Sequence, residues 1–264
     1  MTSSIHQEDA EILENRQIGT GLFLMRLRAP DIASKIGPAQ FVQVQTDPEL
    51  APFLRRPFSA LRVDRTAGWV DILYEVIGRG TGRMAMFEPD TRLNLLGPLG
   101  MPFTPSDTGS LLLVAGGVGL VPLAFLVWEH ADLLPRTTFL MGAANRDRMP
   151  DLSDLLPQNL DWHLATDDGS LGYHGFVTDL IPNHTRAGET TILTCGPHPM
   201  MARVAAIAGD MGHRCYASLE NHMACGFGAC VGCVVEYREA ERDDLRYRRV
   251  CTEGPVVDAH AIVW

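Results

Sequence analysis

Four cysteines near the C-terminus form the clearest chemical pattern in the sequence: Cys225, Cys230, Cys233 and Cys251. The first three follow the spacing C-x4-C-x2-C, and the fourth comes seventeen residues after the third. Structural zinc sites usually present their cysteines as two short pairs, whereas this order is typical of plant-type [2Fe–2S] clusters. Glycines in the loop let its backbone approach a cluster and direct N–H groups at the sulfides. The spacing predicts a [2Fe–2S] cluster; the alternatives are zinc on the same thiolates and four buried thiols without a metal.

A glycine-rich turn in the middle of the chain offers a second kind of chemistry. The apolar run 110–115 leads into Gly116-Gly117-Val118-Gly119, and an apolar segment with helical spacing follows. Strand, glycine turn and helix together can receive a pyrophosphate on backbone amides and a helix N-terminus. Pro122 stands where a standard dinucleotide fingerprint has its third glycine. A plain connection between strand and helix is therefore the alternative.

Strands and helices alternate through the rest of this middle region. Strands are expected at 137–142, 160–166 and 191–194, and helices at 151–156, 175–181 and 199–208. Such alternation predicts a parallel sheet that holds ligands beyond the carboxyl ends of its strands. Asp167-Asp168-Gly169 and Cys195-Gly196-Pro197 follow two of these ends, where a dinucleotide would bind. The alternatives are a tight turn at the first loop and simple packing by Cys195.

The choice between NAD and NADP is left open by the loop after strand 137–142. Arg146 could accept a 2′-phosphate, whereas Asp147 could favour an unmodified ribose.

The N-terminal region has a different pattern, with short strands separated by proline and glycine turns. Strands are expected at 21–28, 41–46, 59–63, 69–77 and 92–96, as in an antiparallel barrel or sandwich. Arg56-Pro57-Phe58-Ser59 places a guanidinium beside a rigid proline, an aromatic ring and a hydroxyl, which together can clamp a diphosphate and cover a flat ring. Gly80-Thr81 provides a glycine turn with a second phosphate contact. A surface arginine pair beside a core phenylalanine is the alternative.

Length and composition restrict the class of protein. The 264 residues suffice for two modest domains with a sizeable core. The formal charge of −10 disfavours a nucleic-acid binder, which would carry a basic field. No uninterrupted apolar run approaches the roughly 20 residues of a membrane helix, and the polar, acidic start is unlike a secretory signal. A soluble, cytoplasmic protein is expected.

Taken in order, these motifs resemble the ferredoxin–NADP reductase superfamily along nearly the whole chain. Within it, the sequence looks most like the electron-transfer subunits of NAD-dependent dihydroorotate dehydrogenases. The closest marks are Ser218-Leu219-Glu220, the compact cysteine loop and the ending 249–255. The resemblance implies an FAD-binding antiparallel β-barrel over 1–104, an NAD-binding α/β domain with a parallel sheet over 105–217, and a small [2Fe–2S] module over 218–264.

The resemblance also implies site residues. FAD would lie against Arg56, Pro57, Phe58, Ser59, Leu73, Tyr74, Glu75, Gly80 and Thr81. NAD would lie against Gly116, Gly117, Gly119, Asp167, Cys195, Gly196 and Pro197, with Cys195 and Gly196 bordering the nicotinamide as catalytic residues. Glu75 departs from the pattern, because many relatives have a basic residue there that could meet a phosphate.

A partner subunit and an electron path follow from the same resemblance. An FMN-containing dihydroorotate dehydrogenase subunit would oxidise dihydroorotate in pyrimidine biosynthesis, and electrons would pass through the cluster and FAD to NAD⁺. Two such chains would assemble with two dehydrogenase chains as a heterotetramer. One alternative is a diaphorase-type subunit serving a hydrogenase, a ferredoxin or a sulfur reductase. Another is a zinc-stabilised nucleotide-binding module without redox activity.

Overall fold

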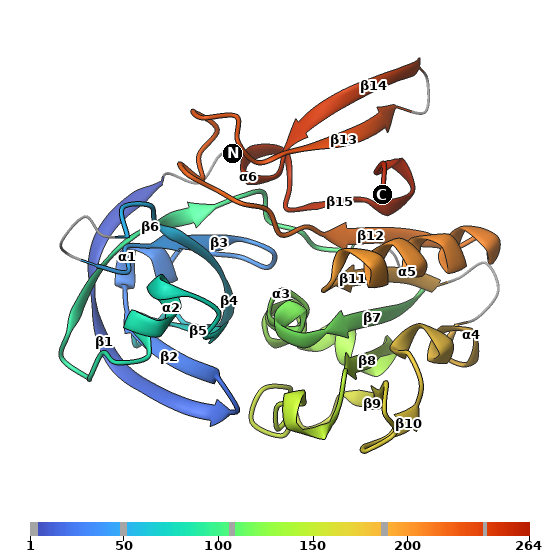
Figure 1. Ribbon diagram of the computed structural model, residues 1–264, viewed down its shortest axis with the longest axis horizontal. Helices are drawn as coiled ribbons and strands as arrows, with labels where there is room; N and C mark the ends of the chain where they lie inside the picture. The colour runs from blue at the N-terminus through green and yellow to red at the C-terminus, as the bar shows by residue number, and fades with distance from the viewer. Residues whose placement is uncertain (1–4, 48–51, 106–108, 186–189, 240–241) are drawn as a thin grey trace.

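A computed structural model describes residues 5–47, 52–105, 109–185, 190–239 and 242–264. Figure 1 shows a barrel formed by the N-terminal part, a sheet with helices formed by the middle part, and a C-terminal hairpin above them. This arrangement confirms the predicted order of a barrel, a parallel-sheet region and a small C-terminal part.

The N-terminal part is a closed antiparallel barrel with strand order β1-β2-β5-β4-β3-β6. Its strands are β1 (His6–Gly19), β2 (Leu22–Arg28), β3 (Phe41–Val44), β4 (Arg56–Asp64), β5 (Trp69–Glu75) and β6 (Arg92–Leu99). Side chains alternate between the two faces of each strand. On β3, Val42 and Val44 point into the barrel core, whereas Phe41 packs outside it against the C-terminal part. The predicted barrel is confirmed, and the long, mostly polar strand β1 is an addition to it.

Two short helices interrupt the barrel strands: α1 (Pro30–Ala33) and α2 (Arg79–Met84). The prediction of a glycine turn at 79–81 is wrong, because Gly80 and Thr81 lie in the first turn of α2. The Thr81 hydroxyl accepts a hydrogen bond from the backbone N–H of Ile77 at 3.0 Å. A side-chain oxygen that accepts from the backbone at a helix start favours helix over turn.

The middle part is a seven-stranded sheet of order β10-β9-β8-β7-β11-β12-β15. Its strands are β7 (Ser110–Gly116), β8 (Thr137–Ala143), β9 (Asp161–Thr166), β10 (Tyr173–His174), β11 (Thr190–Cys195), β12 (Arg214–Ser218) and β15 (Val256–Asp258). All neighbouring pairs are parallel except β12 and β15, which are antiparallel. The parallel sheet is confirmed, with one antiparallel strand at its edge.

Helices connect these strands: α3 (Leu120–Glu129), α4 (Ile181–His184) and α5 (His198–Asp210). Single 3-10 turns lie at η1 (Gly117–Gly119), η2 (Ala131–Arg136), η3 (Arg146–Arg148) and η4 (Val177–Leu180). The expected helix at 151–156 is wrong, since this segment forms turns. Its apolar spacing reflects packing instead, because Leu152, Leu155 and Leu156 are all buried in the core. The expected helix at 175–181 is found only as η4 followed by α4.

The C-terminal part holds the cysteine loop and an antiparallel hairpin of β13 (Val234–Glu239) and β14 (Arg242–Arg249). After the hairpin come α6 (Val250–Glu253), strand β15 in the large sheet and the turn η5 (Ala259–Ala261). The chain therefore leaves the sheet at β12, builds the hairpin and returns to the edge of the same sheet.

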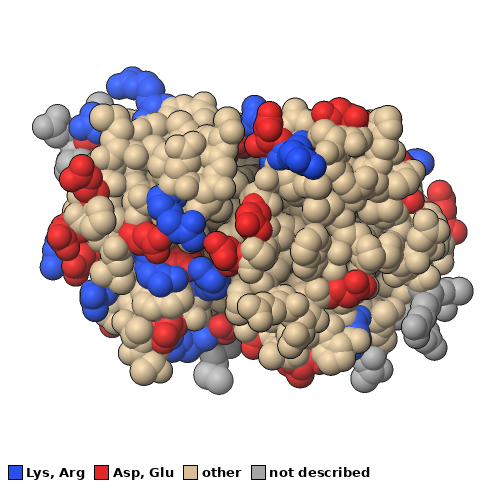
Figure 2. Space-filling model, turned by 90° about the horizontal axis from the view of Figure 1, so that it is seen from below, with Lys and Arg blue, Asp and Glu red and all other residues tan. Residues whose placement is uncertain are grey.

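A shared core fixes the barrel against the sheet. Leu61 of β4 and Leu73 of β5 belong to the same buried cluster as Leu120 and Leu123 of α3. Figure 2 shows that acidic and basic side chains are interspersed on the face seen from below, rather than gathered into one field of a single sign.

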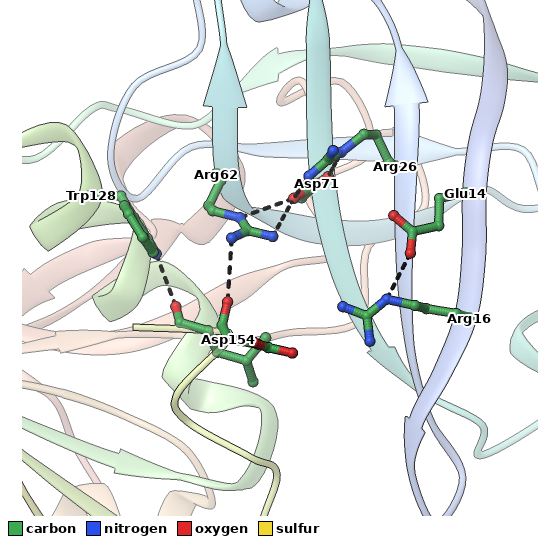
Figure 3. A network of polar contacts seen from close by, with 8 residues as sticks. Glu14, Arg16, Arg26, Arg62, Asp71, Trp128 and Asp154 are labelled. Atoms are coloured by element: carbon green, nitrogen blue, oxygen red, sulfur yellow. Dashed lines mark hydrogen bonds and ion pairs between the residues drawn. The ribbon is translucent and has the colours of Figure 1, made fainter. Parts of the chain in front are cut away.

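A polar network reinforces the same junction (Figure 3). The fully buried Asp71 carboxylate accepts hydrogen bonds from Arg26 at 2.7 Å and from Arg62 at 3.0 Å. Arg62 also donates to the backbone carbonyl of Asp154 at 3.3 Å, and the Trp128 indole donates to the neighbouring Leu155 carbonyl at 2.9 Å. Because Arg62 lies on β4 and Asp154 follows β8, the network ties the two parts together.

No helix among the described residues is long and apolar enough to cross a membrane.

A buried histidine predicts a pH dependence of stability. His213 is only 4% exposed, and within the described part of the chain neither ring nitrogen has a hydrogen-bond partner. Burial lowers the pKa of this imidazole, so the unfolded chain takes up the proton first as the pH falls through about 6.5. The free energy of unfolding should therefore be largest above about pH 6.5 and fall below it, by at most about 1.4 kcal/mol per pH unit.

Replacing this histidine tests the expectation. His213→Leu should flatten the pH dependence of the melting temperature on the acid side. The control is His174→Leu, at an exposed position, which should leave the dependence of the melting temperature on pH as it is in the wild type. An unaltered profile in His213→Leu would contradict the assignment.

Candidate functional site

A cavity of about 510 Å³ lies where the barrel, the sheet and the C-terminal part meet. Six of the residues expected to bind cofactors line it: Glu75, Gly116, Gly117, Gly119, Gly196 and Pro197. The turn 116–119 follows β7, and the turn 196–197 follows the neighbouring strand β11. Carboxyl ends of adjacent parallel strands are where such folds bind ligands. Contact of these residues with a cofactor stays a prediction.

Glycine is required here by close contact between the two turns. A Cβ on Gly119 would lie 2.3 Å from the carbonyl oxygen of Cys195, and a Cβ on Gly116 would lie 2.8 Å from Cδ of Pro197. Gly117 has a φ of 57°, in the left-handed region. The glycines thus allow two backbone turns to approach each other at the wall of one cavity.

Two expected residues are not among those that line this cavity. Asp167 is exposed beyond the end of β9 and is not among the lining residues. Cys195 is fully buried at the end of β11. Burial, together with the nearby carboxylate of Glu220, raises the pKa of the Cys195 thiol well above its usual value, and a hydrogen bond involving Ser218 opposes this only in part. The thiol is therefore neutral.

Acidic side chains contribute more of the lining than the sequence motifs suggested. Glu220 and Glu236 join Glu75 around the cavity. Surrounding protein raises the pKa of the Glu220 carboxyl, although the residue keeps an exposed surface. In the sequence, Glu220 was notable only as part of the segment Ser218-Leu219-Glu220, one of the segments that carry the resemblance to the family. Its position directly after β12, beside β11, is the signal that places it at this edge.

A second group of polar residues converges on the outside of the barrel. A Cβ on Gly80 would lie 2.9 Å from Nε of Arg56 and 3.2 Å from the hydroxyl oxygen of Thr46. The Thr46 hydroxyl is buried and has no hydrogen-bond partner among the residues that the structure describes. A guanidinium and an unpartnered hydroxyl around a glycine fit a phosphate group. Thr46 was not singled out from the sequence, because an isolated threonine after a strand carries no pattern.

Other expected flavin contacts differ in what they can offer. Leu73 packs in the core shared with α3. Tyr74 is 1% exposed, stacks on Phe23 and donates a hydrogen bond to the Asn15 side chain at 3.0 Å. Both side chains are committed to the interior, so the main chain is what they can present to a ligand. The aromatic ring of Phe58 is half-buried and packs against the barrel core from its edge, so its contact with a flavin stays a prediction.

Glu75, the acidic residue that departs from the family pattern, has a basic partner in the structure. Its carboxylate accepts a hydrogen bond from Arg148, which lies on η3 after β8. The pair bridges the barrel and the sheet at the edge of the cavity. Arg146 and Asp147 occupy the same turn, where the Arg146 backbone N–H donates to the Ser170 hydroxyl at 2.8 Å.

The four cysteines of the C-terminal part lie in one interacting group. Cys230 is exposed, Cys225 is half-buried, and Cys233 and Cys251 are buried. The backbone N–H of Cys230 donates to Sγ of Cys225 at 3.4 Å. Burial, the hydrogen bond with the Cys233 thiol and the charge of Cys225 raise the pKa of Cys251 to about 12. The interactions thus link both ends of the cysteine set.

The loop between the first cysteines directs backbone N–H groups at sulfur. Although burial raises the pKa of Cys225, hydrogen bonds from the backbone of Cys230, Phe227 and Ala229 outweigh it and lower the value to about 7. Gly226 and Gly228 have φ values of 77° and 91°, which this tight path requires. Among the described residues, no three His, Cys, Asp or Glu side chains are arranged to hold a single metal ion.

Comparison with known proteins shows a family for this chain. Residues 220–263 match the family model described as the iron-sulfur cluster binding domain of dihydroorotate dehydrogenase B. The dihydroorotate dehydrogenase B (NAD(+)), electron transfer subunit of Desulforamulus reducens is 36% identical over 260 residues, with 97% of this chain and 98% of that protein covered. The subunit of the same name from Fusobacterium nucleatum is 34% identical over 257 residues, covering 94% and 95%.

Solved structures share the fold. The NADH-dependent reduced ferredoxin-NADP oxidoreductase has a TM-score of 0.84 and 23% identity, covering 100% of this chain and 92% of that chain. A ferredoxin NADP+ reductase from Neisseria gonorrhoeae has a TM-score of 0.66 and 16% identity, covering 82% and 94%. The extent of the relatives, the cysteine spacing and the fold agree, and the chain belongs to the family of electron-transfer subunits of dihydroorotate dehydrogenase B (NAD⁺).

Proposed function

We propose that this chain transfers electrons to NAD⁺ from a partner subunit that contains FMN and oxidises dihydroorotate, as a step of pyrimidine biosynthesis. One observation carries the proposal: the cysteine loop, the barrel and the sheet share one core. Phe41 of the barrel, Leu112 of the sheet and Cys233 of the loop belong to the same buried cluster. A cluster held by the loop would therefore lie close to cofactors on both other parts.

The described residues fit three cofactors. Cys225, Cys230, Cys233 and Cys251 would hold a [2Fe–2S] cluster, and the family match over the loop favours this over zinc. Arg56-Pro57-Phe58-Ser59 with Thr46, Gly80 and Thr81 would hold FAD, supported by the guanidinium and the unpartnered hydroxyl. The turns 116–119 and 195–197 would hold NAD in the cavity, with Asp167 as an outer contact. When bound, these groups supply one-electron transfer at the cluster and hydride transfer between flavin and nicotinamide.

The protein's own contribution is placement and electrostatics. The core shared by β4, β5 and α3 fixes the distance between the barrel surface and the cavity, which serves hydride transfer by proximity. The Cys195 thiol, kept neutral by burial, adds no charge beside the nicotinamide position. Carboxylates on the cavity wall favour a cationic ring, as in oxidised nicotinamide.

The division of the chain is part of the proposal: 1–104 for FAD, 105–217 for NAD and 218–264 for the cluster. We also propose a cytoplasmic location, where cysteine ligands stay reduced. A heterotetramer of two such chains and two FMN-containing chains would complete the electron path.

The test combines the chain with its FMN-containing partner. Anaerobically purified protein should show flavin and iron–sulfur absorption bands that bleach on addition of NADH. Dihydroorotate-dependent reduction of NAD⁺ should require both subunits. Repeating the bleaching experiment with NADPH in place of NADH resolves which nucleotide the chain prefers. A colourless protein, or zinc in place of iron by elemental analysis, would refute the proposal.

A further inference from the structure

The outer face of strand β3 is the place where the barrel meets the cysteine loop. Because Val42 and Val44 fill the barrel interior, the alternate residues Phe41 and Gln43 point outward. Phe41 packs in one cluster with Leu99 and Cys233. A Cβ on Gly226 would lie 2.8 Å from both Cγ and Nε2 of Gln43. The amide of Gln43 therefore lies directly against the loop that follows the first cysteine.

This amide is buried without partners. Gln43 is 0% exposed, and neither its Nε2 nor its Oε1 has a hydrogen bond within the described protein. Burying an unpaired amide costs about 1–3 kcal/mol, so such groups point to a ligand. Nearby glutamines are paired: Gln40 donates to the Gly100 carbonyl at 2.7 Å, and Gln45 donates to the Asp47 carbonyl at 3.0 Å.

A second unpartnered group lies on another side of the same loop. The Thr252 hydroxyl is buried, has no hydrogen bond to any described residue, and belongs to the residue directly after Cys251. A Cβ on Gly228 would lie 2.8 Å from Cγ2 of Thr252. The Gln43 amide from the barrel and the Thr252 side chain from α6 thus pack against the loop at two of its glycines. Both side chains hold a buried polar atom that has no hydrogen-bond partner among the described residues.

The chemistry of the site indicates what Gln43 binds. Thiolates and sulfides of a [2Fe–2S] cluster are anionic acceptors, and an amide N–H is a neutral donor that suits a buried position. Hydrogen bonds to cluster sulfurs set the reduction potential, since they stabilise the reduced form, which carries one more negative charge. Gln43 also pairs with Pro57 in the β3–β4 register, beside the proposed flavin contacts.

Resting on the proposed function, we propose that Gln43 is a positioning residue for the cluster: its Nε2 donates a hydrogen bond to a sulfide of the bound cluster and raises the cluster's reduction potential. The barrel strand that borders the flavin then also tunes the neighbouring one-electron centre. Nothing in the cysteine spacing specifies this residue, because it lies far away in the sequence.

The experiment is a redox titration of the full chain with its partner, followed by the EPR signal of the reduced cluster. Gln43→Leu removes the donor at similar volume. We expect the equilibrium constant for reducing the cluster to fall about tenfold, which is about 59 mV for one electron, while the FAD potential stays unchanged. Gln45→Leu is the matched control, since its amide already donates to a backbone carbonyl, and it should leave the cluster potential unchanged.

A second variant and a direct probe keep the test decisive if Gln43→Leu fails to hold the cluster. Gln43→Met keeps an unbranched side chain and should give the same negative shift. Pulsed EPR on wild-type protein labelled with ¹⁵N in glutamine side-chain amides should show a hyperfine coupling to the reduced cluster. Intact clusters with unshifted potentials, or no ¹⁵N coupling, would overturn the inference. Wild-type protein lacking iron would instead refute the proposed function, so the two failures are distinct.

Discussion

Replacing Cys230 by serine should abolish dihydroorotate-dependent reduction of NAD⁺ while NADH-dependent reduction of an artificial dye continues. The cluster would lose a thiolate ligand, and loss of outer-shell partners alone costs about 10–100-fold in metal sites, so removal of a ligand should exceed this. Cys230 is exposed, so the substitution should leave the fold intact. Iron content, the visible spectrum and the two activities measure the outcome.

The matched control for this variant is a cysteine outside the loop. Cys215 is buried on β12 and has no place in the cysteine spacing. Cys215→Ala should keep the iron–sulfur bands and both activities. If Cys230→Ser loses dye reduction although FAD remains bound, the assigned order of the redox centres is wrong. If it keeps the cluster bands, the ligand set is wrong.

Gly119→Ala should weaken both the fold and the binding of NADH. A methyl group there would lie 2.3 Å from the carbonyl oxygen and 2.5 Å from the carbonyl carbon of Cys195. Because backbone cannot rotate away as a flexible side chain does, the turns after β7 and β11 must separate. Overpacking costs about 1–3 kcal/mol, and each 1.4 kcal/mol lost from binding is about tenfold in Kd. Thermal unfolding and NADH titration of the flavin absorption measure the two effects.

Gly117→Ala provides the comparison within the same turn. A Cβ at Gly117 would meet no heavy atom within 4 Å, although its φ of 57° disfavours alanine. A left-handed alanine costs about 1–2 kcal/mol, without forcing the turns apart. Gly119→Ala should therefore raise the Kd for NADH more than Gly117→Ala. Equal effects on the Kd would show that the contact with Cys195 is unimportant for binding.

The sequence predicted those parts of the fold in which local pattern and tertiary role agree. Five barrel strands and the central strands β7, β8, β9 and β11 have the apolar patterns that their burial requires. The glycine turn at 116–119 was recognisable because one short segment contains a strand end, glycines and a helix start. The cysteine spacing pointed to a cluster in a similar way, because three of the four cysteines lie within one short segment of the sequence.

Other features depend on contacts between distant segments. The leucines at 152, 155 and 156 have helical spacing, but they fill a core between the sheet and the barrel from a run of turns. The first turn of α2 depends on the Thr81 hydroxyl accepting backbone N–H groups. Thr46 and Gln43 carry no local signal at all, since only the folded barrel brings them to Arg56 and Gly226.

The strand that closes the large sheet has a consequence for how the C-terminal part can be exchanged. β15 pairs antiparallel with β12, and the Met101 backbone N–H of the barrel side donates to the Gly254 carbonyl at 2.7 Å. Recombination that deleted everything after β12 would leave an open edge, a template for self-association. A C-terminal part exchanged from another protein would have to bring its own strand to pair with β12. Point mutations on the surface are therefore a simpler way than gene fusion to adapt this chain to another electron donor.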